Sequence, residues 1–202
     1  MTLGHRWWAV LLLVGLLCGC YASGGATAYY TLHSTREMAL SAKNPPSDRL
    51  IIGLGPVVLP EYLDREAIVT RMGPNRLAVH DRHRWAASLQ SEISRVLAAD
   101  LSRLAHVKQV VIFPWSTQIE PDLRFRVEIL SFEGDLGKQV TLKAAWSLTS
   151  GQSRQSAVRR VTVHQEAIKG RGFEAMAAAM TRALTVLGQE MADAVGKATA
   201  GN

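Results

Sequence analysis

Cysteine is scarce in this sequence, which has 202 residues and two of that type, Cys18 and Cys20. A small secreted scaffold held by disulfides needs several cysteines spread along the chain, so that class is excluded. Proline and glycine are also few, at 7 and 16 residues, which excludes collagen-like repeats and low-complexity disorder. Hydrophobic residues make up 48% and charged residues 20%, as in an ordinary globular protein. A chain of this length buries about 70% of the surface of its unfolded form, enough to fold without a metal or a disulfide.

Long apolar runs are scarce as well, because residues 7–17 form the one run that stands out. These eleven residues are too few to cross a membrane, which takes about 20, and a multi-span membrane protein is therefore excluded. His5 and Arg6 precede the run and small residues follow it. This order is typical of a secretory signal peptide, which we place at residues 1–19.

The signal ends in Leu17-Cys18-Gly19-Cys20, a sequence typical of bacterial lipoproteins. Leucine stands three residues before Cys20 and the small Gly19 directly before it, whereas the bulky Leu17 precedes Cys18 and makes that residue a poorer candidate for lipidation. An ordinary secretory signal with two incidental cysteines and a short uncleaved anchor remain as alternatives. Cleavage before Cys20 removes 19 of 202 residues and one of 23 basic residues, which leaves 183 residues and, against 17 acidic ones, a formal charge of +5.

Lipidation of Cys20 predicts where the protein is held. Several acyl chains such as palmitate on one cysteine anchor a protein stably, whereas a single chain binds a membrane only marginally. Inner-membrane retention in enteric bacteria usually requires Asp at the next position, and Tyr21 stands there instead. We therefore predict an outer-membrane anchor, a flexible tether over residues 20–28 and a body that faces the periplasm.

The remaining chain predicts one α+β domain over residues 29–197. A mixed, largely antiparallel sheet with two long helices on one face follows from helical periodicity between groups of alternating strands. Trp85 is predicted to open the first helix and Trp146 to point inward from the most regular strand. Val161 and Val163 are predicted to face inward, with Arg160 and Thr162 on the wet face. The strands are expected near residues 29–33, 50–58, 68–71, 77–80, 109–113, 123–129, 139–148 and 157–164, and the helices near 85–104 and 173–194.

Signals for catalysis are weak. His80 and His83 could share a metal, but no carboxylate or cysteine cluster supports them, and we expect a solvated loop. Gly53-Leu54-Gly55 follows a strand but leads to proline, so it is no phosphate-binding loop. The Gly-x-Ser-x-Gly elbow and the His-Glu-x-x-His motif are absent, although composition leaves open a dispersed Ser-His-Asp site. We predict no catalytic residue, no metal and no cofactor.

Two further patterns leave alternatives open. The basic residues are dispersed, which argues against nucleic acid and favours a solvated surface, with anionic lipid or an acidic partner as the alternative. The near-heptad spacing of the C-terminal helix could mean a coiled coil and a homo-oligomer, although its many alanines favour packing within the chain. The spaced positions are Phe173, Ala177, Met180, Leu184, Leu187, Met191 and Ala194.

Several segments together resemble a known family. The lipoprotein signal, Tyr29-Tyr30-Thr31-Leu32, Phe113-Pro114-Trp115 and above all the sequence from Val57 to Arg65 with Ile68-Val69-Thr70-Arg71 are similar to the ABC-type transport auxiliary lipoproteins. The resemblance implies an outer-membrane protein that works with MCE-domain proteins and inner-membrane components in lipid transport. It also implies a fold similar to the N-terminal domain of TolB, and no catalytic residues.

The turn from Pro60 to Arg65 is our candidate partner-binding site. Its residues Tyr62, Leu63, Asp64 and Arg65 combine an aromatic, an aliphatic and two charged side chains on a stiffened turn, and Tyr and Arg are frequent in interface hot spots. The alternative is that Tyr62 and Leu63 cap the core while Asp64 and Arg65 pair locally.

These inferences predict a lipid-anchored, non-enzymatic accessory protein that docks a transport partner at the outer membrane. The expected partners are an MCE-domain periplasmic protein and its inner-membrane transport component. A lipid-tethered periplasmic hydrolase and a TolB-like envelope scaffold are the alternatives.

Overall fold

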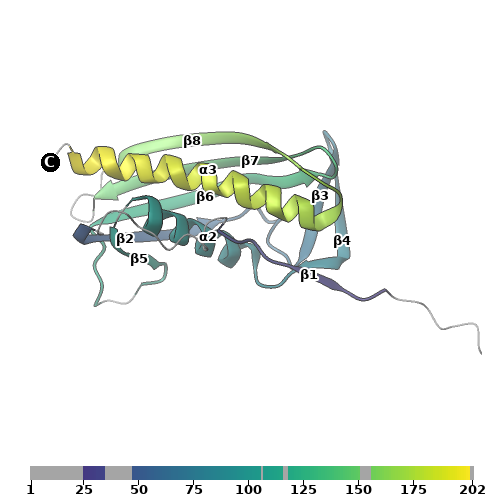
Figure 1. Cartoon of the computed structure of the whole chain (residues 1–202), viewed down its shortest axis with the longest axis horizontal. Coiled ribbons are helices and arrows are strands. Elements are labelled where there is room, and N and C mark those ends of the chain that lie inside the picture. The colour runs from purple at the N-terminus through teal and green to yellow at the C-terminus, as the bar shows by residue number, and fades with distance from the viewer. Residues whose placement is uncertain (1–24, 35–46, 106, 116–117, 151–155, 201–202) are drawn as a thin grey trace, which may run out of the picture.

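The computed structural model describes residues 25–34, 47–105, 107–115, 118–150 and 156–200. The predicted signal peptide and Cys20 lie outside these residues. In the described part of the chain, eight strands form one sheet and two helices cover one of its faces (Figure 1). The elements are β1 (Ala28–Tyr30), β2 (Ser47–Val58), β3 (Ala67–Gly73), β4 (Arg76–Trp85), α2 (Leu89–Leu104), β5 (Val107–Ile112), β6 (Leu123–Asp135), β7 (Gln139–Ser150), β8 (Ser156–Ala167) and α3 (Gly172–Ala200).

Strand β6 organises the sheet. β7 pairs with it antiparallel along its whole length, and β8 extends β7 antiparallel. The other edge of β6 takes two strands in succession, because β2 runs parallel to its first half and β3 meets its far end, where Thr70 lies opposite Gly134. Residues 59–66 therefore leave this edge of β6 and return to it. β5 adds to β2, β4 to β3 and β1 to β4, which confirms the predicted α+β class with a mixed sheet.

Helix α3 lies across β6, β7 and β8 and beside α2. Two glycines permit its close approach: a Cβ on Gly134 would lie 2.6 Å from Met176 Sδ, and a Cβ on Gly188 would lie 3.0 Å from Asp100 Cβ. Of the near-heptad positions, all except the half-buried Phe173 are buried inside the chain. The apolar face of α3 is thus used within the fold, as its small residues indicate.

The chain enters the domain between the two helices. Leu32 is fully buried, and its backbone N–H donates to Glu92 of α2 at 3.0 Å. The next N–H, of His33, donates to Thr181 of α3 at 3.4 Å, and the Ser34 hydroxyl donates to the buried Asp100 of α2 at 2.9 Å. These bonds fix the segment that leads back toward the tether.

Two predicted details are wrong. Trp85 does not open the first helix: it ends β4, its N–H donates to the Glu66 carbonyl, and α2 begins at Leu89 after Ser88, whose hydroxyl accepts from the Ser91 N–H at 3.2 Å. The apolar pattern continued across this boundary because the end of the strand and the helix bury side chains in the same core.

The orientation of β8 is also reversed. Thr162 is buried, whereas Val161 and Val163 are 60% and 62% exposed. Thr162 points inward because its hydroxyl accepts a hydrogen bond from Trp146 Nε1 at 3.0 Å and donates to Glu190 of α3. Trp146 itself is 2% exposed, as predicted.

Candidate docking surface

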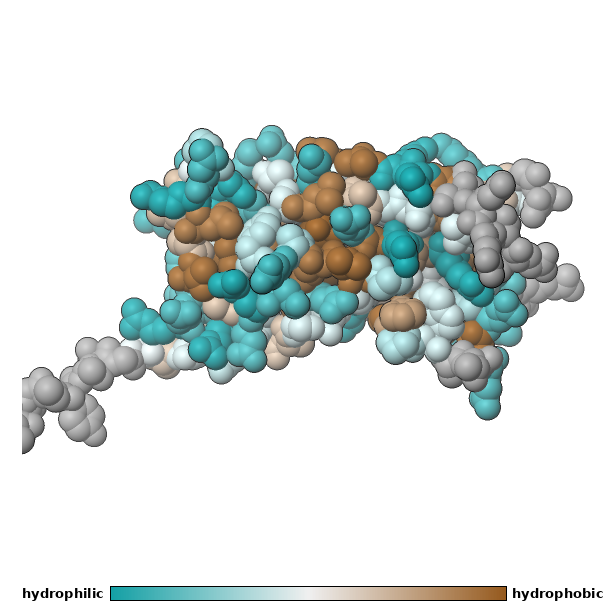
Figure 2. Space-filling view, turned by 180° about the vertical axis from the view of Figure 1, so that it is seen from behind, coloured by the Kyte–Doolittle hydropathy of each residue, from teal (hydrophilic) through white to brown (hydrophobic). Residues whose placement is uncertain are grey.

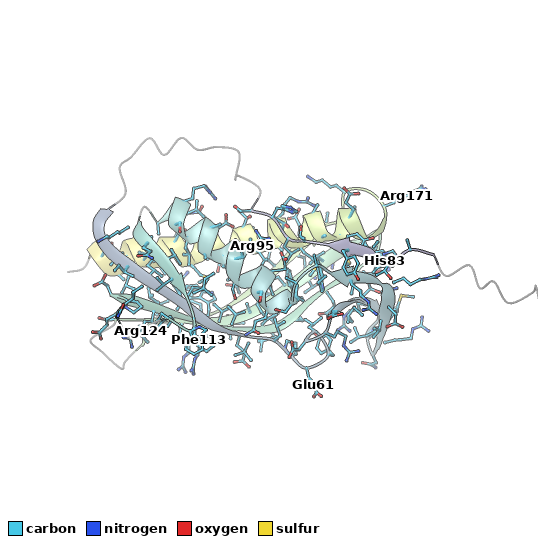
Figure 3. All side chains as sticks on the ribbon, turned by 90° about the horizontal axis from the view of Figure 1, so that it is seen from below. Glu61, His83, Arg95, Phe113, Arg124 and Arg171 are labelled. Atoms are coloured by element: carbon cyan, nitrogen blue, oxygen red, sulfur yellow. The ribbon has the colours of Figure 1, made fainter. Side chains whose placement is uncertain are left out.

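The turn from Pro60 to Arg65 stands where β2 leaves the edge of β6. Backbone bonds from the Leu63 N–H to the Pro60 carbonyl at 2.9 Å and from the Asp64 N–H to the Glu61 carbonyl at 3.2 Å close it. Glu61 points away from the molecule on the side of the sheet opposite the helices (Figure 3). The turn therefore belongs to the sheet face opposite α2 and α3.

The four predicted site residues divide into two pairs. Leu63 is 3% exposed and belongs to the core, and the half-buried Tyr62 packs against that core. Asp64 and Arg65 are exposed. The structure thus gives Tyr62 and Leu63 the core-capping place and leaves Asp64 and Arg65, with Glu61, accessible to a partner.

A buried carboxylate holds this turn. Glu133 of β6 is 3% exposed, and it accepts hydrogen bonds from the Tyr62 hydroxyl at 3.0 Å and from the Phe132 N–H at 2.9 Å. Arg71 of β3 binds the same carboxylate through Nε at 2.9 Å and through Nη2. A buried charge is tolerated only when it is paired and hydrogen-bonded, and this one satisfies both conditions.

The surroundings of Tyr62 keep its hydroxyl protonated, so that it donates a hydrogen bond to Glu133. Burial and the neighbouring Glu133 carboxylate raise the pKa of Tyr62 to about 12, because both disfavour a phenolate. Hydrogen bonding to Glu133 raises the pKa of Arg71, which stays charged. The cluster joins the turn, β3 and β6 into one rigid unit.

Sequence reasoning did not find Glu133 or Arg71. Residues 123, 125, 127 and 129 alternate inward, and continued alternation would send Glu133 toward the helices. The pairing with β7 shifts between Ile129 and Ser131, so that Phe132 and Gly134 face inward and Glu133 faces the turn. A single extra residue in the strand produced the site, and the change of apolar residues from odd positions up to Ile129 to the even-numbered Phe132 is the signal that could have revealed it.

The sheet face opposite α2 and α3 carries an apolar patch (Figure 2). Val58, Leu130, Val161 and Val163 expose 48%, 37%, 60% and 62% of their surface. The strand register places Val58, Glu128, Ala145 and Val161 in one row across β2, β6, β7 and β8. We define these side chains, with Leu130 and Val163, as the open-face patch.

The histidine pair packs against an aromatic ring of helix α3. His80 and His83 lie in strand β4 rather than in the expected solvated loop. Phe173 of α3 packs over them, and its ring centroid lies 3.8 Å from that of His83 and 4.8 Å from that of His80. Burial and the nearby His83 lower the pKa of His80. Among the described residues, no group of three or more His, Cys, Asp or Glu could hold a metal ion.

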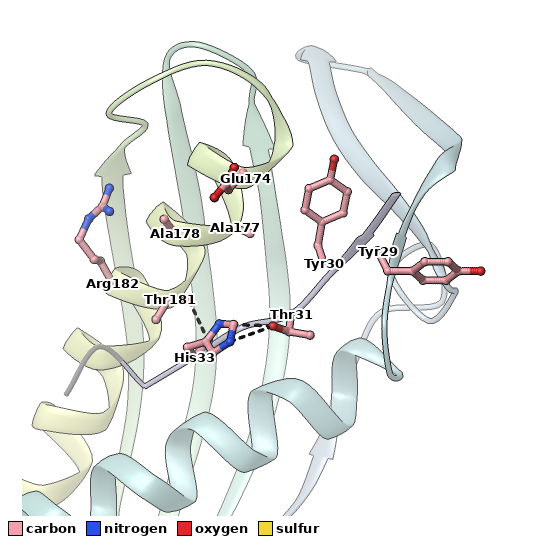
Figure 4. A pocket seen from close by; sticks show the side chains of 9 residues that line it. All are labelled: Tyr29, Tyr30, Thr31, His33, Glu174, Ala177, Ala178, Thr181 and Arg182. Carbon is pink, nitrogen blue, oxygen red and sulfur yellow. Dashed lines mark hydrogen bonds between the residues drawn. The ribbon is translucent and has the colours of Figure 1, made fainter. Parts of the chain in front are cut away.

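A pocket between residues 29–33 and the first turns of α3 is lined by His33, Glu174 and Arg182, among others (Figure 4). Its Arg182 is bound to Glu166 at 2.6 Å and to the Ala167 carbonyl at 2.9 Å, which lowers the pKa of Glu166. Its His33 contacts the Thr31 hydroxyl at 3.2 Å. Of the histidine hydrogen bonds that the structure describes, none joins a serine, so the hydrolase alternative gains no support here.

Within the described ranges, neither helix has the length and apolar character needed to cross a membrane.

Comparison with known proteins places this architecture among solved structures. A crystal structure of an uncharacterized protein aligns with a TM-score of 0.66 at 18% identity, over 84% of this chain and 98% of the other. Protein XCC0632 from Xanthomonas campestris, of family DUF330, aligns with a TM-score of 0.64 at 15% identity, over 88% and 98% of the two chains. At these identities the likeness shows the fold. No curated protein matches the chain in sequence.

The family follows from a match in sequence. The model of the ABC-type transport auxiliary lipoprotein component family matches residues 30–192, which is well over half of the 202 residues. The matched range includes the turn, the Glu133 cluster and the open-face patch. This chain belongs to the ABC-type transport auxiliary lipoprotein component family.

Proposed function

We propose that this protein is a lipid-anchored, non-enzymatic accessory component of a periplasm-spanning lipid transport system of the MCE and ABC type. Its signal peptide, residues 1–19, is removed, and acyl chains on Cys20 hold it in the outer membrane. Its folded body then captures a periplasmic transport partner. Within the family, this chain resembles the intermembrane transport lipoprotein PqiC.

The observation that carries this proposal is the match of residues 30–192 to a family of transport auxiliary lipoproteins. The lipoprotein signal before Cys20 supports the anchor, and Tyr21 supports the outer membrane. The proposal of a bound partner is supported by the surface of the domain, where the exposed charges of the hydrogen-bonded turn lie beside an apolar sheet face. Tyr62 and Leu63 pack against the core beneath the turn, whereas the exposed Asp64 and Arg65 are the residues that a partner can contact.

Charge reversal at the tip of the turn tests the docking role. Asp64→Lys with Arg65→Glu should weaken capture of a purified MCE-domain partner by at least about tenfold, or about 1.4 kcal/mol, because each substitution replaces a complementary charge with a like one. Folding should be unaffected, since both side chains are exposed. Binding to the immobilised lipidated protein and circular dichroism measure the two effects.

The matched control exchanges the signs of an exposed ion pair elsewhere, with Lys138→Glu and Asp135→Lys. That variant should capture the partner as well as the wild type does. Unchanged capture by the turn variant, with intact folding, would remove the turn from the docking surface.

A further inference from the structure

The open-face patch lacks the polar character of a solvated sheet face. An antiparallel sheet with one wet side normally presents polar residues there, and contiguous exposed apolar side chains mark interaction sites. Four large apolar side chains, Val58, Leu130, Val161 and Val163, are exposed on β2, β6 and β8, with Glu128 and Ala145 between Val58 and Val161. Helix α3 and helix α2 occupy the opposite face, so neither covers them.

Positive charge accompanies the patch. Arg126 of β6 and Arg159 of β8 are exposed and both lie opposite Ser147 of β7, in the row next to Val58 and Val161. Neighbouring strands are about 4.8 Å apart, so these two guanidinium groups emerge within about 10 Å of each other. Lys143, exposed beside Val163, adds a third cation on the other side of the apolar row. Glu128 is the one acidic member of these rows.

The patch lies between two covered parts of the same face. At one end Tyr62 and the turn lie over Glu133. At the other, Trp115 and Pro121 lie against Gly53, where a Cβ would approach Pro121 Cγ to 2.9 Å and Trp115 Cζ3 to 3.1 Å. An occupant must therefore be narrow, and it must bring apolar groups for the valines and negative charge for the cations.

We propose that the open-face patch binds a peptide segment of the transport partner that presents both aliphatic and acidic side chains to the sheet. This proposal rests on the proposed function and names the surface and the partner chemistry of the same docking event. The aliphatic side chains of this segment cover Val58, Val161 and Val163, and its carboxylates reach Arg126 and Arg159. The exposed tip of the turn borders this surface and belongs to it.

Other occupants fit less well. Two copies of the chain packed face to face would bring Arg126, Arg159 and Lys143 against their own counterparts, and like charges across an interface are repulsive. An acyl chain needs a pocket that encloses most of its surface, whereas these valines stand on an open sheet.

Photocrosslinking in the native envelope tests the proposal with the full lipidated chain. A benzophenone amino acid replaces Val161, and in a matched control it replaces Val79, which is 45% exposed on β4, a strand that does not pair with β6, β7 or β8. Mass spectrometry then maps the crosslinked peptide. We expect the Val161 probe, and not the Val79 probe, to crosslink a segment rich in Asp, Glu and aliphatic residues in another envelope protein.

A second arm tests the charges. Arg126→Glu with Arg159→Glu in the Val161-probe chain should lower the crosslink yield by at least about tenfold, as expected for like charges across an interface. Equal circular dichroism of the purified variants controls for folding.

Each outcome decides. The proposal is overturned if the Val161 probe crosslinks a second copy of the chain or lipid, or if it gives no more crosslinked product than the Val79 probe. It is also overturned if the charge reversal leaves the crosslink yield unchanged. An acidic segment in a protein other than an MCE-domain partner supports the patch chemistry while contradicting the proposed function. An MCE-domain partner that is crosslinked only elsewhere keeps the function and overturns this inference.

Discussion

Removing one hydroxyl from the turn gives the sharpest test of the Glu133 cluster. Tyr62→Phe keeps the ring that packs against the core and deletes the 3.0 Å bond to the buried carboxylate. Hydrogen bonds to charged groups contribute about 1.5–3 kcal/mol, so the free energy of unfolding should fall by that amount. Urea denaturation of the purified protein measures it. Tyr29→Phe is the matched control, because Tyr29 is 64% exposed and its substitution should leave the unfolding midpoint unchanged.

The same substitution has a signature at alkaline pH. The folded pKa of Tyr62 is raised to about 12, whereas the ordinary value is 10.0. The folded state therefore holds its proton more tightly, and the stability that comes with it is present below pH 10 and is lost as the pH rises toward 12. Tyr62→Phe should lose less stability than the wild type across that window. A change in unfolding free energy below about 0.5 kcal/mol at pH 7, far under the expected range, would refute the cluster as an anchor of the turn.

Three further predictions concern the core, the helix packing and the anchor. Trp146→Ala should destabilise the domain by about 3–5 kcal/mol in urea unfolding, because it empties a fully enclosed aromatic site, and a loss under about 1 kcal/mol would contradict this packing. Gly134→Val should lower the thermal midpoint, because even its Cβ would lie 2.6 Å from Met176 Sδ, and an unchanged midpoint would show that α3 does not pack this closely. Cys20→Ser should move the protein from the membrane to the soluble fraction of an envelope wash, and undiminished retention would contradict the lipoprotein assignment.

The sequence predicted those parts of the fold in which the local spacing of apolar residues is compatible with one secondary structure and one buried face. Strict alternation in β7 placed Trp146 inward, and the spacing of apolar residues with many alanines predicted α3 and its packing within the chain. The strands expected near residues 68–71 and 77–80 are present as β3 and β4, which pair antiparallel. In each of these elements periodicity and burial agree.

The errors arose where tertiary contacts override the local pattern. β8 lies at the edge of the sheet, and a hydrogen bond to Trp146 turns Thr162 inward while Val161 and Val163 face outward. A strand and a helix that share one core gave continuous apolar spacing, which hid the boundary between Trp85 and Leu89.

The candidate site shows the same limit. The sequence singled out the turn by the chemistry of Tyr62 and Arg65, but Glu133, which is 71 residues from Tyr62, could not be assigned to it. The shift in pairing within β6 coincides with a change in phase of its apolar residues between Ile129 and Phe132, but that change does not show which residues the outward-turned Glu133 meets. The open-face patch was missed for a related reason, since its valines were expected to be inside.

The central claim is that the folded body, held by lipid on Cys20, brings a transport partner to the outer membrane. Co-flotation tests this most directly: outer-membrane vesicles from cells that express either the wild-type chain or the Cys20→Ser variant are mixed with the purified MCE-domain partner and floated through a density gradient. We predict that the partner floats with wild-type vesicles and stays at the bottom with the variant. Equal flotation of the partner with both kinds of vesicle, or with neither, would contradict the account.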